Sequence, residues 1–204
     1  MQTRATFDAA ATAFLDLAAQ IPTIGYAGPG LGDWDLRSLV GHTSRSFVTV
    51  TTYLGTRAES TEVTSPAEYF AAVSRIAAAD TTGAIRQRGV DAGIALGDDP
   101  LAVLRQCKAD ADAALDALEG DPVVETIAGG MRVSEYLPTR TFELTVHCLD
   151  IARATGLAFT PPHAALVESL DVAAETALAL GMGIDVLLTL TGRQPLPPNC
   201  SVVP

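Results

Sequence analysis

The chain has 204 residues, a length that suits one domain with a sizeable core, and we expect a single domain over residues 1–204. Hydrophobic residues make up 48% of the sequence but aromatic residues only 5%, so Ala, Leu and Val form most of the core, as in closely packed helices. The formal net charge of −11 argues against a protein that binds nucleic acid or an anionic membrane surface through clustered Lys and Arg.

The cysteines and the N-terminal segment indicate the compartment. Cys107, Cys148 and Cys200 form no Cys-x-x-Cys pair, and an odd number of cysteines does not suit a disulfide framework. The first residues lack the apolar stretch of a signal peptide, and no segment approaches the ~18 uninterrupted apolar residues of a transmembrane helix. We therefore expect a cytoplasmic protein that is not bound to a membrane.

Hydrophobic residues recur with helical spacing through most of the chain. The predicted helices, in chain order, cover residues 3–20, 33–55, 65–76, 98–120, 138–156 and 162–181. Capping residues mark the starts of the second, third and fourth helices, namely Asp33 or Asp35, then Ser65 and then Asp98 or Asp99. The stretch after the third helix is interrupted by three glycines and has no clear assignment.

Residues 123–137 break the helical pattern. Two short runs, VVETI and MRVSEYL, flank the sequence AGG, which predicts a small β-hairpin with a glycine-rich turn. Pro138 is expected just before, or within the first turn of, the helix that follows. The end of the chain is too rich in Pro to stay helical. The residues thus predict an all-α domain built around a helical bundle, with a small hairpin.

Three residues are candidate ligands of a divalent metal: His42, Glu143 and His147. Glu143 and His147 are four residues apart, so they share one face of a helix, and His42 lies in an earlier helix. Two imidazoles and one carboxylate suit a zinc-like cation, and three protein ligands leave one coordination position open for water or substrate. The residues alone leave other interpretations open, in which Glu143 pairs with Arg140, His147 donates to a backbone carbonyl, and His42 is a satisfied core histidine.

Two neighbouring residues are candidates for supporting roles. Asp150, three residues after His147, could orient that imidazole or simply lie at the surface. Arg140, one turn before Glu143, could bind an anionic group of a substrate or only neutralise the glutamate. The remaining histidine, His163, follows two prolines at a helix start and is expected to be exposed, so it is excluded from the ligand set. The cysteines have no activating neighbour and are expected to be structural.

Three stretches carry a resemblance to a known family, in this order: WDLRSLVGH (34–42), RTFELTVHCLDIARATG (140–156) and LLTLTGRQPLPP (187–198). With them the chain resembles the mycothiol-dependent maleylpyruvate isomerase family, and specifically its N-terminal domain. That domain is a DinB-like four-helix metal-binding bundle, so the resemblance implies an all-α fold with extra short helices and the small hairpin. The family's ligands, His, Glu and His, fall on His42, Glu143 and His147 without gap or substitution. We expect the isomerase's C-terminal domain to be absent, in which case the chain looks more like the family's thiol transferases, or its members of unassigned substrate.

The resemblance implies a metal-dependent enzyme that activates a low-molecular-weight thiol, mycothiol, for transfer to, or isomerisation of, a small electrophile. Zinc is the expected metal, with nickel, iron or manganese as alternatives. The expected partners are the thiol and the electrophile, and a homodimer is compatible with the sequence. The same ligands also suit a metal-dependent hydrolase that uses bound water, or a bundle that keeps the metal for stability alone. A cavity beside the ligands favours catalysis, whereas a fourth protein ligand favours a structural metal.

Overall fold

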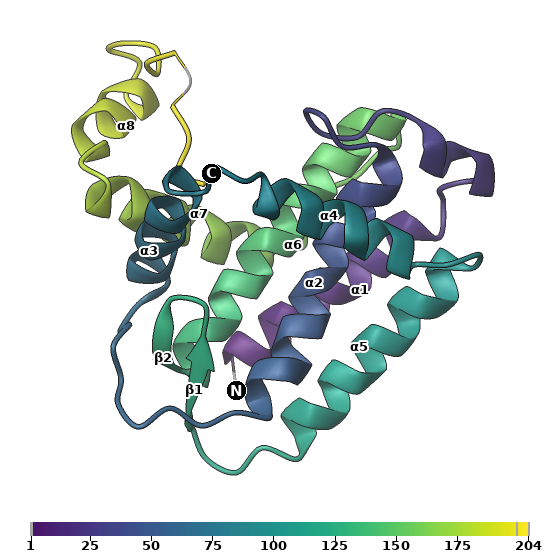
Figure 1. The fold of residues 1–204 in the computed structure, drawn as a ribbon. Coiled ribbons are helices and arrows are strands. Elements are labelled where there is room, and N and C mark those ends of the chain that lie inside the picture. The colour runs from purple at the N-terminus through teal and green to yellow at the C-terminus, as the bar shows by residue number, and fades with distance from the viewer. Residues whose placement is uncertain (1, 199, 204) are drawn as a thin grey trace.

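The computed structural model describes residues 2–198 and 200–203. Within them the chain forms eight α-helices, one 3₁₀ helix and one two-stranded hairpin (Figure 1), which confirms the all-α class with a small hairpin. Among the described residues, no helix has the combination of length and hydrophobicity that crossing a bilayer requires.

Four long helices form the central bundle: α1 (Gln2–Ala18), α2 (Leu36–Leu54), α5 (Pro100–Asp116) and α6 (Val133–Thr155). α1 and α2 each pack against both α5 and α6, so the four helices enclose one core (Figure 1). Each of these helices has an apolar stripe that must be buried, and a bundle buries all four stripes at once.

Aromatic rings fill the centre of the core although the chain has few of them. Phe47 of α2 lies 6.3 Å from Phe7 and 5.8 Å from Phe14 of α1, measured between ring centroids, and all three side chains are fully buried. Aromatic pairs at such separations contribute about 0.5–1.5 kcal/mol each beyond the burial of their area. These rings bridge the centre of the bundle between α1 and α2.

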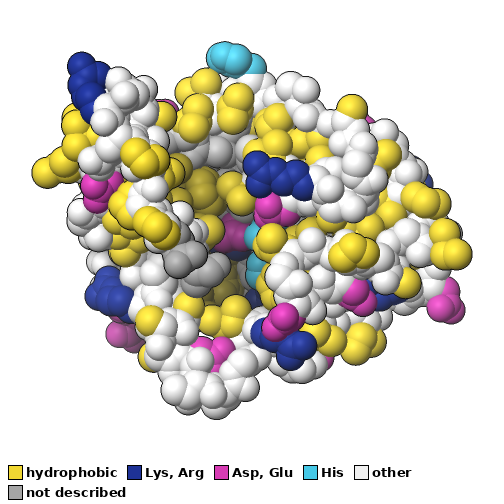
Figure 2. All heavy atoms as spheres, turned by 90° about the horizontal axis from the view of Figure 1, so that it is seen from above, with side chains coloured by type: hydrophobic (Ala, Val, Ile, Leu, Met, Phe, Trp, Pro, Cys, Tyr) yellow, Lys and Arg dark blue, Asp and Glu magenta, His cyan; other side chains and the backbone are white. Residues whose placement is uncertain are grey.

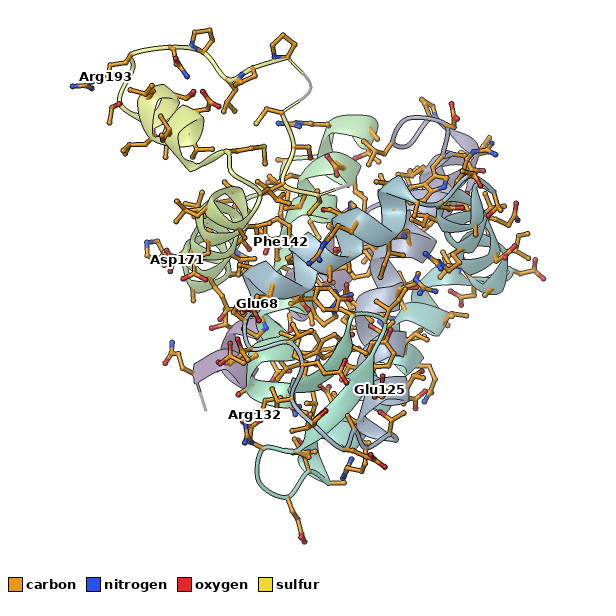
Figure 3. The ribbon with its side chains drawn as sticks, turned by 60° about the vertical axis from the view of Figure 1, so that its left-hand side comes forward. Glu68, Glu125, Arg132, Phe142, Asp171 and Arg193 are labelled. Atoms are coloured by element: carbon orange, nitrogen blue, oxygen red, sulfur yellow. The ribbon has the colours of Figure 1, made fainter. Side chains whose placement is uncertain are left out.

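The other elements surround the bundle, with these bounds: η1 (Thr23–Ala27), α3 (Pro66–Ala78), β1 (Val123–Thr126), β2 (Gly129–Arg132), α7 (His163–Ala179) and α8 (Gly183–Leu190). α3 and α7 pack against each other and against α6, while α8 packs on α7. Figure 3 shows Phe142 of α6 inside the molecule, whereas Asp171 of α7 and Arg193, just after α8, lie at its periphery.

The stretch without a sequence assignment forms α4 (Ala84–Ala95), which lies directly on α2. The two helices approach so closely that a Cβ on Gly41 would clash with the backbone nitrogen of Gly93. A Cβ on Gly93 would lie 2.9 Å from the Cα of Ser38. Glycine weakens the helical pattern of α4 in the sequence, but it is what allows α4 to approach α2.

The start of α6 corrects the sequence-based boundary. The helix begins at Val133, so Pro138 lies inside it rather than in its first turn. Asp121 caps this start from a distant part of the chain: its Oδ1 accepts from the backbone N–H of Ser134 and its Oδ2 from the Ser134 hydroxyl, both at 2.8 Å. Pro138 has no N–H group, so it cannot donate the helix hydrogen bond to the Ser134 carbonyl. Ser134 is exposed, so water can donate to that carbonyl instead.

The hairpin also differs from the prediction, because its glycines lie in a strand and not in the turn. Residues 127 and 128 connect the strands, and Gly129 and Gly130 belong to β2. The carbonyl of Gly130 accepts from the backbone N–H groups of Glu62 and Val63, at 2.8 and 3.0 Å. A Cβ on Gly130 would clash with the carbonyl oxygen of Ser60, so glycine lets the segment before α3 cross the strand.

We predict that Gly41→Ala destabilises the protein by about 1–3 kcal/mol, because the added methyl group has no space against the α4 backbone. The loss should occur although Ala improves helix propensity by roughly 1 kcal/mol over Gly. Urea denaturation followed by circular dichroism measures the change. Gly55→Ala, at the end of the same helix, is the matched control and should change stability by less than about 0.5 kcal/mol. A Gly41→Ala variant as stable as the wild type would contradict the close α2–α4 contact.

Candidate metal centre

The three predicted ligands come together between two neighbouring helices of the bundle. His42 lies on α2, and Glu143 and His147 lie one turn apart on α6. The Nε2 atoms of both histidines face the same carboxylate oxygen, Oε2 of Glu143, at 3.9 Å for His42 and 3.1 Å for His147. One donor atom from each residue lies within 4.8 Å of the others. That they coordinate a metal remains a prediction.

Trp34 packs against the His42 ring. Its ring stacks on the imidazole with centroids 4.7 Å apart and a tilt of 35°. The indole Nε1 donates to the carbonyl of Arg86 on α4, at 3.0 Å, and the ring packs against Gly89, where a Cβ would clash. The glycine surface of α4 therefore makes room for the tryptophan that positions His42.

Asp150 positions the second histidine. Its Oδ2 lies 3.2 Å from Nδ1 of His147, and Glu143 lies on the other side of the same ring. The predicted shared face of Glu143, His147 and Asp150 is thus present in the structure. A carboxylate that accepts from Nδ1–H fixes the tautomer and leaves Nε2 available as a ligand atom. Nδ1 of His42, in contrast, is buried without a hydrogen-bond partner among the described residues.

Burial and neighbouring charges set the protonation of the three residues when no cation is bound. Burial disfavours a charged Glu143, but the hydrogen bond and charge of His147 outweigh it and lower the Glu143 pKa to about 2. Burial likewise disfavours a charged His147, yet hydrogen bonds to Asp150 and Glu143 raise its pKa to about 9. The pKa of His42 falls to about 4, first through burial and then through the charge of His147. At neutral pH a cation would therefore displace one proton, from His147.

The donor set fits a divalent cation of the zinc class. Two imidazole nitrogens converge on one carboxylate oxygen, which is the ligand combination that such cations bind. Among the described residues, no fourth His, Cys, Asp or Glu joins this group. His163, excluded on sequence grounds, is exposed at the start of α7.

A cavity of about 190 Å³ adjoins the three residues. Figure 2 looks into this hollow, where histidine and acidic side chains are visible between hydrophobic ones. Most of its wall is apolar, and the described lining residues of this kind are Leu31, Trp34, Val73, Ile85, Ile127, Phe142, Val146 and Val203. An apolar wall limits the access of water to a group bound beside the ligands.

Arg140 lines the same cavity. One interpretation of the sequence paired it with Glu143, but the structure does not contain this ion pair. Within the described part of the chain, no carboxylate oxygen lies within 4.0 Å of its guanidinium. Its Nε donates to the hydroxyl of Thr139 at 3.0 Å, and its Nη2 to the hydroxyl of Tyr69 at 3.3 Å. The guanidinium carbon lies 5.3 Å from the ring centroid of Tyr69 and 5.0 Å from that of Tyr136.

Several lining residues were not foreseen from the sequence, and Arg45 and Tyr69 are two of them. Arg45 lies three residues after His42 and so shares its helix face, a spacing that could have identified it. Tyr69 comes from α3, and no local pattern indicates that this helix packs against α6 near the metal ligands.

A family model described as "Mycothiol maleylpyruvate isomerase N-terminal domain" matches residues 7–152. The matched range contains His42, Glu143, His147, Arg140 and Asp150, and it ends within α6. Searches of curated proteins and of solved structures returned no significant match.

Proposed function

Because the chain belongs to the mycothiol maleylpyruvate isomerase N-terminal domain family, a metal-binding family of DinB-like proteins, we propose that it is a metal-dependent enzyme acting with a thiol. The thiol is mycothiol. The enzyme either transfers it to a small electrophile or uses it to isomerise that electrophile. His42, Glu143 and His147 hold the metal, which is zinc.

One observation carries this proposal: two imidazole nitrogens face one oxygen of a half-buried carboxylate beside a cavity. A metal kept for stability is usually enclosed by four protein ligands, whereas a catalytic one keeps a position open towards a substrate site. Three candidate ligands and an adjoining cavity among the described residues support the catalytic alternative.

Each part of the site has a role in this chemistry. A divalent cation there supplies Lewis acidity, which lowers the pKa of a thiol into the physiological range. Asp150 orients the His147 ring, and Trp34 keeps the His42 ring in place by stacking. The apolar wall around them excludes water that would compete with the sulfur for the electrophile.

The reaction class is attack of a thiolate sulfur on an electrophilic carbon. The thiol proton passes to solvent and a sulfur–carbon bond forms. In transfer, the leaving group departs with the electron pair of its bond to that carbon. In isomerisation, the π electron pair of the double bond moves onto a conjugated carbonyl group of the electrophile as sulfur adds. The adduct rotates about the resulting single bond, and the return of the electron pair expels the thiolate and restores the double bond with the opposite geometry.

Metal content and a cobalt-substituted sample test this proposal. Elemental analysis of the purified protein should find close to one metal ion per chain. Adding mycothiol to the cobalt-substituted protein should change its visible absorption, because sulfur would enter the coordination shell. Formation of a thioether from mycothiol and a fluorogenic alkylating agent should then require the metal. A protein that binds no metal after reconstitution would refute the enzyme proposal, and an unchanged cobalt spectrum would refute the role of the thiol.

His147→Ala should abolish stoichiometric metal binding, because it removes one of the three ligands. His163→Ala is the matched control, since this exposed histidine lies outside the cluster, and its metal content should equal that of the wild type. Elemental analysis after dialysis against a weak chelator gives both values. Metal retained at one equivalent in His147→Ala would overturn the ligand assignment.

For Asp150→Asn we expect a loss of metal affinity of about 10–100-fold, the usual effect of removing a carboxylate that orients a ligating histidine. Competition with a chromophoric chelator measures it. Asp171→Asn, on the exposed side of α7 (Figure 3), is the control and should leave the affinity unchanged. If both variants bind the metal equally well, Asp150 has no role in orienting His147.

A further inference from the structure

Arg140 is a buried positive charge without a carboxylate partner in the described part of the chain. Its residue surface is only 7% exposed, and its contacts are two hydroxyl groups and two tyrosine rings. Hydroxyl oxygens and aromatic faces offset part of the cost of removing a guanidinium from water. A buried charge is normally completed by an opposite charge in direct contact. The charge of Glu143 acts on Arg140 only from beyond 4.0 Å, so a direct partner is left for a ligand to provide.

The surroundings of Arg140 place this unmatched charge inside the candidate active site. Arg140 lies three residues before Glu143, which on a helix is a rise of about 4.5 Å, so both face the same cavity. Arg45 lies one turn after His42 on α2 and lines that cavity too, as does Arg88 of α4.

The charge of the cavity is opposite to that of the whole chain. Glu143 is the only acidic residue among its described lining residues, against three arginines, while the chain as a whole carries −11. A divalent cation would add further positive charge. The cavity is therefore complementary to an anion, and the cation ligands alone do not require this.

We propose that Arg140, together with Arg45, forms an anion subsite beside the metal ligands, and that it binds the carboxylate of the electrophilic substrate. The assignment to the electrophile rests on the function proposed above, because mycothiol carries no carboxylate of its own. The planar guanidinium suits a carboxylate, which it can bind through two parallel hydrogen bonds.

The position of the subsite also limits the size of this substrate. Arg140 and Glu143 are separated by one helical turn, so the carboxylate and the reacting carbon must be only a few bonds apart. The cavity of about 190 Å³ is below the range of drug-sized ligand sites, roughly 300–1,000 Å³. Short unsaturated or halogenated acids meet both conditions, and Tyr69 acts as the positioning residue that holds the guanidinium.

The lone tryptophan provides a direct readout, because Trp34 lines the same cavity. Titration with propionate, an unreactive short acid, should change Trp34 fluorescence saturably, while the neutral isostere propionamide should not. Arg140→Gln should weaken propionate binding by about 10- to 100-fold, as expected for lost hydrogen bonds between charged groups. Arg140→Lys keeps the charge but cannot form two parallel hydrogen bonds, so its affinity for propionate should lie between those of the wild type and Arg140→Gln. Arg193→Gln, at the distant periphery in Figure 3, is the matched control and should bind as the wild type does.

The titrations are made on zinc-loaded and on metal-free protein, so that direct binding of the acid to the metal is recognised. Dependence on Arg140 in both forms supports the subsite. Should Arg140→Gln fail to fold by circular dichroism, Arg45→Gln and Tyr69→Phe replace it, each with an expected loss of at least several-fold.

Three results would overturn the proposal. The first is equal affinity for propionate and propionamide. The second is an unchanged affinity for propionate in folded Arg140 and Arg45 variants. The third is binding of inorganic phosphate that depends on Arg140 and is tighter than the binding of propionate. Because no thiol and no turnover enter these titrations, the subsite can be present even if the cobalt test excludes thiol chemistry. Conversely, a cobalt spectrum that responds to mycothiol without any binding of propionate would refute the subsite alone.

Discussion

A carboxylate inside a helical bundle must be compensated, and the centre of this molecule is organised around that requirement. Glu143 lies on the longest helix, α6, among residues that pack into the core. Its Oε2 atom is faced by one imidazole from its own helix and one from α2. This arrangement joins two neighbouring helices through polar groups, and the hydrogen bond from the Tyr136 hydroxyl of α6 to the Thr49 hydroxyl of α2 joins them a second time. The carboxylate and the two imidazoles form a donor set suited to a divalent cation. Compensating the half-buried charge of Glu143 and binding a metal therefore require the same arrangement of side chains.

The packing of α4 on α2 links the fold to this centre. Glycine at positions 41 and 93 lets the two helix backbones approach, and Gly89 leaves space for the Trp34 ring. The ring in turn stacks on His42 and is tied to α4 through its indole N–H. A methyl group at any of these glycines would move α4 or the tryptophan, and with them one wall of the cavity. The glycines therefore act on the site through helix packing, although none of them supplies a ligand atom.

The distribution of charge separates the surface from the cavity. Acidic residues dominate the chain as a whole, whereas the described lining of the cavity holds three arginines and a single glutamate. Arg140 contacts Tyr69 and Tyr136, whose hydroxyl group and rings orient the guanidinium without neutralising its charge. If the proposed metal is bound, a cation oriented beside it would position an anionic substrate at little entropic cost. The proposed site would then favour small, negatively charged electrophiles over neutral ones.

Short-range patterns in the sequence determined the helical class, most helix starts and the spacing of Glu143, His147 and Asp150. Asp35, Ser65 and Asp99 cap their helices through bonds to backbone groups three residues on, and such contacts are legible in a single sequence. The tertiary structure alone decided the start of α6, because its cap, Asp121, lies far outside the helix. It also decided the existence of α4, whose glycines weaken the helical pattern and serve a contact with another helix. Helix packing likewise decided that His42 lies beside Glu143 and that Arg140 is buried without an ion-pair partner among the described residues. The reason is that distances between side chains on different helices are set by the whole core and not by neighbours in the chain.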